Sequence, residues 1–145
     1  MADAARRGAA AAHHRAGAAG GRFGEQALGF IGPCAQGLDT LVQAAQAQLG
    51  RAPLVVPGDG RALRRVAWCT GGAQDYFEAA IAAGADAFLT GEISEPQAHL
   101  ARETGVAFLA CGHHASERYG APAVAAHVAA QFGLEHVFID LDNPA

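Results

Sequence analysis

The 145-residue sequence contains no lysine, so all ten of its basic residues are arginines, and they are outnumbered by 14 acidic residues. The formal net charge of −4 argues against a general nucleic-acid-binding surface, which needs an excess of positive charge. The three cysteines are odd in number, widely spaced and never form a CxxC pair, which fits a reducing, cytoplasmic location better than a disulfide scaffold. No apolar run approaches the roughly 18 residues of a membrane span, and no membrane partner is expected.

Residues 1–22 lack large apolar side chains, because alanine and the initiator methionine are their only apolar residues. A segment with nothing large to bury does not offset the entropy cost of ordering. We therefore expect a disordered Ala/Arg/Gly tail over residues 1–22 and one α/β domain over residues 23–145.

Short apolar runs alternate with helical patterns from Phe23 onward. Apolar residues at helical spacing, bounded by glycine or proline, predict helices over residues 38–49, 73–83, 95–104 and 123–132. Apolar runs predict strands over residues 28–31, 54–56, 63–69, 87–90, 106–111 and 137–141. The repeated strand-helix order predicts an α/β fold with a mostly parallel sheet flanked by helices.

Unusual residues follow three of the predicted strands, in the segments Cys69–Gly72, Thr90–Glu92 and Cys111–Glu117. In an open parallel sheet, functional groups gather at the carboxyl ends of the strands. We therefore expect these three segments to meet at one rim of the sheet. The two cysteines end apolar strands, where buried structural thiols are commoner than nucleophiles.

His113 and Glu117 are four residues apart, so one helical turn places both side chains on the same face. An imidazole and a carboxylate together suit a divalent ion such as Zn, Fe, Ni or Mn. Two ligands are too few for a tight site. In the alternative interpretation, Glu117 caps the turn and the two adjacent histidines are polar residues of the rim.

The other candidates at this rim are weaker. Gly71-Gly72 precedes a predicted helix and offers backbone N–H groups to an anion such as phosphate, with Thr70 and Thr90 as neighbouring candidates. In the alternative interpretation, the two glycines form a tight turn that needs positive φ. Glu92 is a candidate proton acceptor or hydrogen-bond partner of a ligating imidazole. His99 either reaches toward the rim or is a surface histidine.

Four segments in the same order resemble a known family: Arg65–Gly72, Gly84–Glu92, Gly112–Arg118, and Phe138–Asp140 with Asn143–Ala145. They resemble the carboxyl-terminal part of the YbgI or Nif-three-like dinuclear metal-centre proteins, also called GTP cyclohydrolase 1 type 2 homologs. The resemblance covers approximately residues 23–145.

The resemblance implies that His113 and Glu117 bind a pair of divalent metal ions, which favours the ligand interpretation of both. The adjacent His114 matches a variable position and is not counted as a ligand. Thr90, Glu92 and His99 match residues that line the same cleft, with Glu92 and His99 as candidates for moving protons. The family further implies a toroidal homohexamer and a metal-dependent hydrolase that acts on a small, nucleotide-like substrate.

The sequence departs from the family pattern in its amino-terminal portion. Relatives are close to twice as long, and their first half supplies a His-His pair and a His-to-Asp segment that complete the metal site. The Ala/Arg/Gly tail stands in that place, as expected of a truncated or frameshifted start. A non-catalytic fragment or structural assembly module with an incomplete site is therefore the alternative function. A phosphate-binding regulatory module that uses Gly71-Gly72 is a third.

Overall fold

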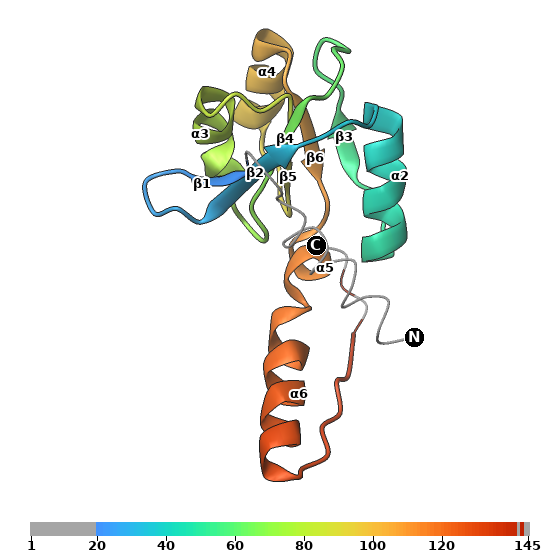
Figure 1. Cartoon of the computed structure of the whole chain (residues 1–145). Coiled ribbons are helices and arrows are strands. Elements are labelled where there is room, and N and C mark those ends of the chain that lie inside the picture. Colours follow the sequence, from blue (N-terminus) through green and yellow to red (C-terminus); the bar gives the residue numbers. More distant parts are fainter. Residues whose placement is uncertain (1–19, 142, 144–145) are drawn as a thin grey trace.

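The structure is a computed structural model and describes residues 20–141 and residue 143. Most of the tail expected over residues 1–22, and the Pro144-Ala145 end of the family resemblance, lie outside the described residues. Gly21 and Arg22, which we had placed in the tail, belong to the first strand. The elements in chain order are β1 (Gly21–Phe23), β2 (Gly29–Pro33), α2 (Leu38–Leu49), β3 (Leu54–Val56), β4 (Arg65–Trp68), η1 (Gln74–Tyr76), α3 (Phe77–Ala82), β5 (Ala87–Thr90), α4 (Glu95–Thr104), β6 (Ala107–Ala110), α5 (His113–Glu117) and α6 (Gly120–Phe132) (Figure 1).

The strands form one six-stranded sheet in the order β1-β2-β4-β5-β6-β3. The β4–β5 and β5–β6 pairs are parallel, whereas the other three pairs are antiparallel. The α/β fold class is confirmed, but the expectation of a mostly parallel sheet is wrong. The loop between β1 and β2 is too short for a helical crossover, so these two strands pair as an antiparallel hairpin.

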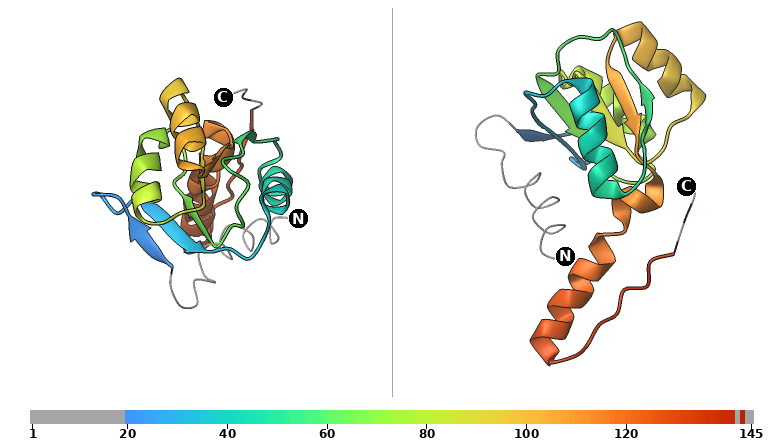
Figure 2. Two further views of the ribbon diagram at one scale, coloured as in Figure 1. Left: turned by 90° about the horizontal axis from the view of Figure 1, so that it is seen from above. Right: turned by 90° about the vertical axis from the view of Figure 1, so that its right-hand side faces the viewer.

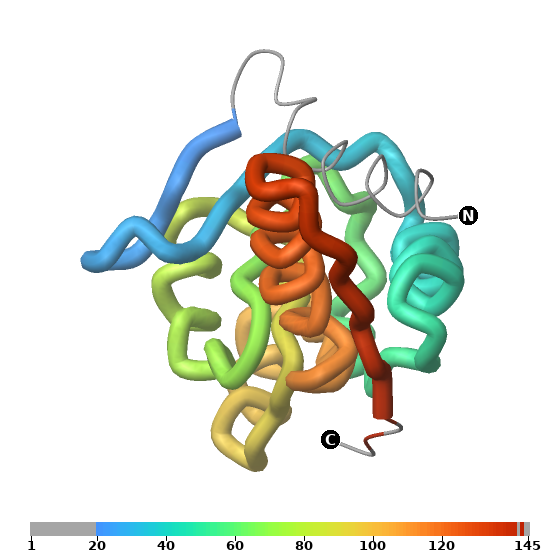
Figure 3. Tube along the Cα trace, turned by 90° about the horizontal axis from the view of Figure 1, so that it is seen from below, coloured from blue at the N-terminus to red at the C-terminus, as the bar shows by residue number. Residues whose placement is uncertain are grey.

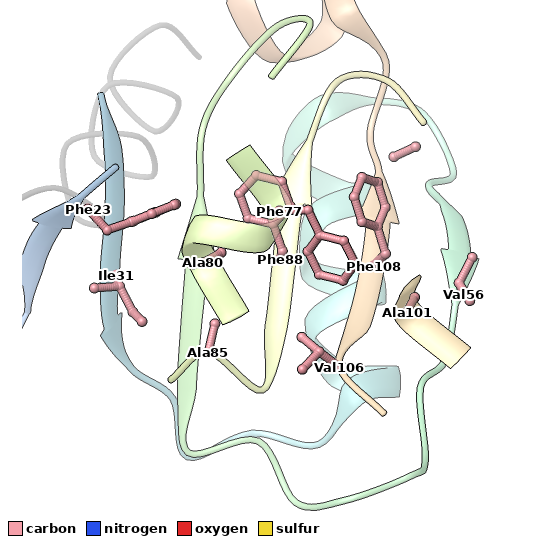
Figure 4. Packing of buried hydrophobic residues seen from close by; sticks show 12 residues of the cluster. Phe23, Ile31, Val56, Phe77, Ala80, Ala85, Phe88, Ala101, Val106 and Phe108 are labelled. Atoms are coloured by element: carbon pink, nitrogen blue, oxygen red, sulfur yellow. The ribbon is translucent and has the colours of Figure 1, made fainter. Parts of the chain in front are cut away.

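Helices cover both faces of this sheet. Figure 2 shows α3 and α4 on one face and α2 on the other. The core under α3 and α4 is built around Phe77, Phe88 and Phe108, which are each at most 1% exposed and pack with ring centroids 4.9–5.7 Å apart (Figure 4). A second core lies under α2 and includes Ala45 and Leu109. The two cores make the central strands a rigid support for the loops that follow them.

Local sequence signals place several helix boundaries. The helices α2 and α4 have the predicted bounds, and each ends at a glycine in the left-handed conformation, Gly50 at φ +73° and Gly105 at φ +72°. The helix expected over residues 73–83 is divided into the 3-10 turn η1 and the short α3. Helix α6 begins at Gly120, earlier than the predicted start at residue 123, and Pro122 falls in its first turn, where the backbone N–H groups have no intrahelical partner and a proline is tolerated.

Helix α6 projects away from the sheet, and the extended segment after it runs back beside the helix (Figures 1 and 3). The strand expected over residues 137–141 is not formed, and Val137, Ile139 and Leu141 are 84%, 77% and 72% exposed. A strand needs a partner edge, and here the segment lies along α6 instead of along β1 or β3. Within the described part of the chain, no helix combines the length and apolar character needed to span a bilayer.

Candidate metal centre

The carboxyl ends of β4, β5 and β6 lie next to one another, as the sequence predicted for the rim. Hydrogen bonds continue past the ends of the strands: the Gly91 N–H donates to the carbonyl of Gly71 (2.8 Å), and the Gly112 N–H donates to that of Gly91 (2.9 Å). The expected convergence of the three segments is confirmed. The backbone that carries Glu92 is therefore tied on both sides, to the Gly71 loop and to the start of α5.

The imidazole of His113 lies between two carboxylates. His113 begins α5, so Glu117 follows one turn later, and its Oε2 lies 3.1 Å from His113 Nε2. On the other side of the ring, Nδ1 lies 2.5 Å from Oε1 of Glu92. The three side chains are 42–50% exposed, so solvent and small solutes reach all of them.

The two carboxylates control the protonation of this imidazole. The hydrogen bond to Glu92 raises the pKa of His113 above its ordinary value, and the nearby charge of Glu117 adds to the shift. In the absence of a cation, a proton on each ring nitrogen satisfies both carboxylates, because Nδ1–H then donates to Glu92 and Nε2–H donates to Glu117. A metal ion at Nε2 would take the place of that proton, because a ligating imidazole must be neutral at the ligating nitrogen.

Glycines form the floor beneath these side chains. A Cβ on Gly71 would collide with the Glu117 carboxylate, and Gly71 has a φ of +72°. A Cβ on Gly91 would lie 2.7 Å from the His113 Cα. The Gly71 N–H donates to the Ser116 hydroxyl (3.0 Å), which itself donates to the carbonyl of His113 (3.0 Å). Gly71 thus serves the tight turn that we weighed as the alternative to an anion site, and its N–H is already used.

The remaining predicted anion-binding residues differ in exposure, and Gly72 lies beside Glu92 and His113. Thr90 is 1% exposed, and its hydroxyl donates to the Gly71 carbonyl (3.0 Å) and accepts from the Ala73 N–H (3.3 Å). Thr70 and Gly72 are exposed. Thr90 therefore holds the loop in place from below, instead of facing a ligand.

His99 lies apart from this cluster. It is exposed on α4, where its Nε2 lies 3.6 Å from Oε1 of Glu95. It does not line the cavity that Glu92 and His113 line. The structure thus brings together Glu92, His113 and Glu117 and leaves the fourth predicted residue on the surface.

The two cysteines at the strand ends are located as expected of structural thiols. Burial raises the pKa of both, for Cys111 to about 11, and Cys111 is 2% exposed. The raised pKa values favour the neutral thiol form of both residues near neutral pH.

A cavity of about 400 Å³ opens beside the cluster and is lined by Glu92, His113, His114, Glu117, Arg118 and Asn143. Two of these residues contact the segment after α6: His114 Nε2 lies 2.9 Å from Asp140 Oδ1, and Arg118 Nη1 lies 2.7 Å from Asp140 Oδ2. The hydrogen bond from His114, together with the Arg118 guanidinium, lowers the pKa of Asp140. Sequence reasoning assigned no role to these three residues, although all lie within the motifs that carried the resemblance.

Two donor atoms have a spacing suited to a metal ion. Two ligands on a tetrahedral ion with bonds of about 2.0 to 2.1 Å are roughly 3.3 Å apart, close to the 3.1 Å between His113 Nε2 and Glu117 Oε2. Glu92 suits the carboxylate that commonly orients a ligating imidazole from its other nitrogen. Among residues 20–141 and 143, however, no group of three or more His, Cys, Asp or Glu side chains is arranged to hold a metal ion. The described residues therefore fit one side of a metal centre and do not complete it.

Known proteins have a similar sequence over part of their length. A "GTP cyclohydrolase 1 type 2 homolog" from Pseudomonas aeruginosa is 58% identical over 97 residues, which are 67% of this chain and 38% of that protein. One of the same name from Neisseria meningitidis serogroup B is 52% identical over 126 residues, which are 86% of this chain and 51% of that protein. The chain thus spans about half or less of the length of these curated relatives.

Solved structures show the corresponding similarity in three dimensions. The structure described as "protein ybgI, unknown function" matches with a TM-score of 0.76 and 42% identity, over 81% of this chain and 49% of that one. A protein from Thermus thermophilus matches with a TM-score of 0.70 and 28% identity, over 79% of this chain and 46% of that one. The family model described as Duf34/NIF3 (NGG1p interacting factor 3) matches residues 3–144. The chain therefore belongs to the Duf34/NIF3 family, as the resemblance in its motifs implied.

Proposed function

We propose that this chain contributes His113 and Glu117 to a divalent-metal centre, with Glu92 as the residue that orients the His113 ring. The observation that carries the proposal is the position of the imidazole between two carboxylates, 2.5 Å from Glu92 at Nδ1 and 3.1 Å from Glu117 at Nε2. A proton held at Nδ1 by Glu92 leaves Nε2 with its lone pair directed toward Glu117 and the solvent. This is the arrangement in which a histidine ligates a metal ion.

The proposed activity is that of a metal-dependent hydrolase acting on a small, nucleotide-like substrate. A bound divalent ion lowers the pKa of a water molecule and polarises the substrate. The chain itself supplies a cavity of about 400 Å³, within the size range of small-molecule sites. Glu92 accepts a hydrogen bond from His113, and its side chain is 46% exposed. Its carboxylate can therefore also accept a proton at the mouth of this cavity.

The remaining ligands of the proposed centre, and a second ion if two are bound, have to be supplied from outside the described residues. A homo-oligomer is one source of such ligands. Exposed apolar side chains on α6, among them Val124 at 65% and Phe132 at 74%, support association of this arm with a further protein surface.

A non-catalytic assembly module is the second candidate function. The observation that favours it is the lack of a third metal-binding side chain near His113 and Glu117 among residues 20–141 and 143. Both candidates share the same fold and differ in whether the donor pair binds metal.

Metal content decides between the two functions. The chain is produced without a histidine tag, purified without chelator and analysed for transition metals by elemental analysis. The His113→Ala/Glu117→Ala double variant is compared with His127→Ala, which removes an exposed histidine of α6. Stoichiometric metal in the wild type and in His127→Ala, lost in the double variant, supports the metal centre and justifies an activity screen on nucleotides. Metal near zero in all three proteins rejects it and supports the assembly module.

A further inference from the structure

The carboxylate of Asp140 is held by two donors from adjacent turns of one helical segment. His114 lies in α5, and Arg118 caps its C-terminal end in a helical conformation, so the two side chains are four residues apart on one face. His114 Nε2 donates to Oδ1 at 2.9 Å, and Arg118 Nη1 donates to Oδ2 at 2.7 Å. Each oxygen of the carboxylate thus has its own donor, which is the geometry by which proteins recognise an anionic group with two oxygens.

Hydrogen bonds, rather than packing, hold Asp140 in this position. Its neighbours on either side, Ile139 and Leu141, are 77% and 72% exposed, and the segment from Leu134 to Leu141 contains no helix or strand. The side chain of Asp140 is itself 40% exposed. Exposed ion pairs contribute little to stability, so another anion can compete with this carboxylate for the two donors.

One of the two donors, Arg118, has a second anchor besides Asp140. Arg118 Nη2 donates to the carbonyl of Leu49 at the end of α2 (2.9 Å), which fixes the guanidinium from its other side. Tyr119 also donates to this helix end, through its hydroxyl to the carbonyl of Gln48 (2.9 Å). Because α2 anchors Arg118 and α5 carries His114, a ligand meets two donors already in place.

We propose that His114 and Arg118 form an anion subsite for a carboxylate or phosphate group of the substrate, and that Asp140 occupies this subsite as an internal competitor. Both residues line the same cavity as His113 and Glu117. An anion bound there is therefore held beside the metal centre by contacts separate from the metal ligands. The subsite's place in the reaction rests on the proposed function, whereas its affinity for an anion does not.

The test measures anion binding to the full chain after metal is removed with a chelator, so that a missing metal centre does not affect the result. Acetate and inorganic phosphate are titrated separately, and the dissociation constants are measured by NMR chemical-shift changes in the wild type and in Asp140→Asn. If Asp140 occupies the two donors in all but roughly one molecule in ten, only about a tenth of the molecules can bind the anion, and removing this carboxylate lowers the apparent dissociation constant about tenfold. The probe that binds more tightly identifies the substrate group as a carboxylate or a phosphate.

Two further variants show whether these donors bind the anion. In the Asp140→Asn background, Arg118→Ala and His114→Ala are each expected to abolish the gain, because alanine has no side-chain donor, whereas Arg102→Ala, at an exposed arginine of α4, leaves it unchanged. His114→Ala leaves the contact between Arg118 and Leu49 intact, so it remains informative if Arg118→Ala fails to fold. The proposal is overturned if Asp140→Asn binds neither probe more tightly than the wild type, or if the gain survives the loss of either donor. Metal content is measured separately and tests only the proposed function.

Discussion

Thr90→Val is expected to destabilise the domain by about 2 kcal/mol, because it removes a hydroxyl that holds the site loop from below. Thr90 is 1% exposed, and its hydroxyl accepts from the Ala73 N–H at 3.3 Å and donates to the Gly71 carbonyl at 3.0 Å. Valine has almost the same volume, so packing changes little. In the variant, the Gly71 carbonyl still accepts a hydrogen bond from the Gly91 N–H (2.8 Å). The Ala73 N–H, in contrast, loses the Thr90 hydroxyl as its acceptor.

The magnitude follows from these two contacts. The lost acceptor of Ala73 costs about 1 kcal/mol, at the lower end of the range for an unsatisfied buried donor because the bond is long. Loss of the bond to Gly71 costs about 1 kcal/mol more. For a domain of this size the total corresponds to a fall in Tm of roughly 6 to 10 °C.

Urea denaturation followed by circular dichroism measures this change as a shift of the midpoint. Thr40→Val, at an exposed position of α2, is the matched control and is expected to change stability by less than about 0.5 kcal/mol. Thr90→Ser keeps the hydroxyl and should therefore lose less stability than Thr90→Val. Equal midpoints for Thr90→Val and the wild type would refute the structural role of this hydroxyl.

Two further predictions concern the site and a buried thiol. Glu92→Ala removes the carboxylate at His113 Nδ1 without removing a proposed ligand, and should weaken metal binding roughly 10- to 100-fold in competition with a chromophoric chelator. The exposed Glu95→Ala is the control, and equal affinity of Glu92→Ala and wild type would contradict the orienting role. Because burial raises the pKa of Cys111 to about 11, only about one thiol in a thousand is a thiolate at pH 8, and iodoacetamide should leave Cys111 unmodified in the native protein. Mass spectrometry should show labelling of Cys111 after denaturation in urea, and rapid labelling of the native protein at pH 8 would contradict its burial.

Much of the local structure follows from patterns that act over a few residues. Apolar positions at helical spacing and a terminal glycine correctly placed both ends of α2 and α4. The runs Leu54–Val56 and Ala87–Thr90 were predicted as strands with the observed bounds. These signals suffice because helix periodicity and the left-handed cap depend on neighbouring residues alone.

The segment over residues 137–141 shows where such reasoning fails. Its apolar run is typical of a strand, but such a run indicates only that the side chains are suited to burial. Whether a strand forms depends on an unpaired sheet edge within reach, and here the chain leaves the sheet along α6 (Figure 1). The prediction of a mostly parallel sheet was wrong for a related reason. Whether two strands pair parallel or antiparallel depends on the path of the chain that connects them.

The sequence by itself determined the family, the short-range helix and strand pattern, and the pairing of His113 with Glu117 across one helical turn. Only the tertiary structure decided that Glu92 meets the opposite nitrogen of His113, that Thr90 supports the loop from inside, and that Asp140 lies on His114 and Arg118. The physical reason is distance along the chain. Contacts four residues apart follow from helix geometry, whereas contacts across about twenty residues depend on the order of the strands and the route of the loops between them.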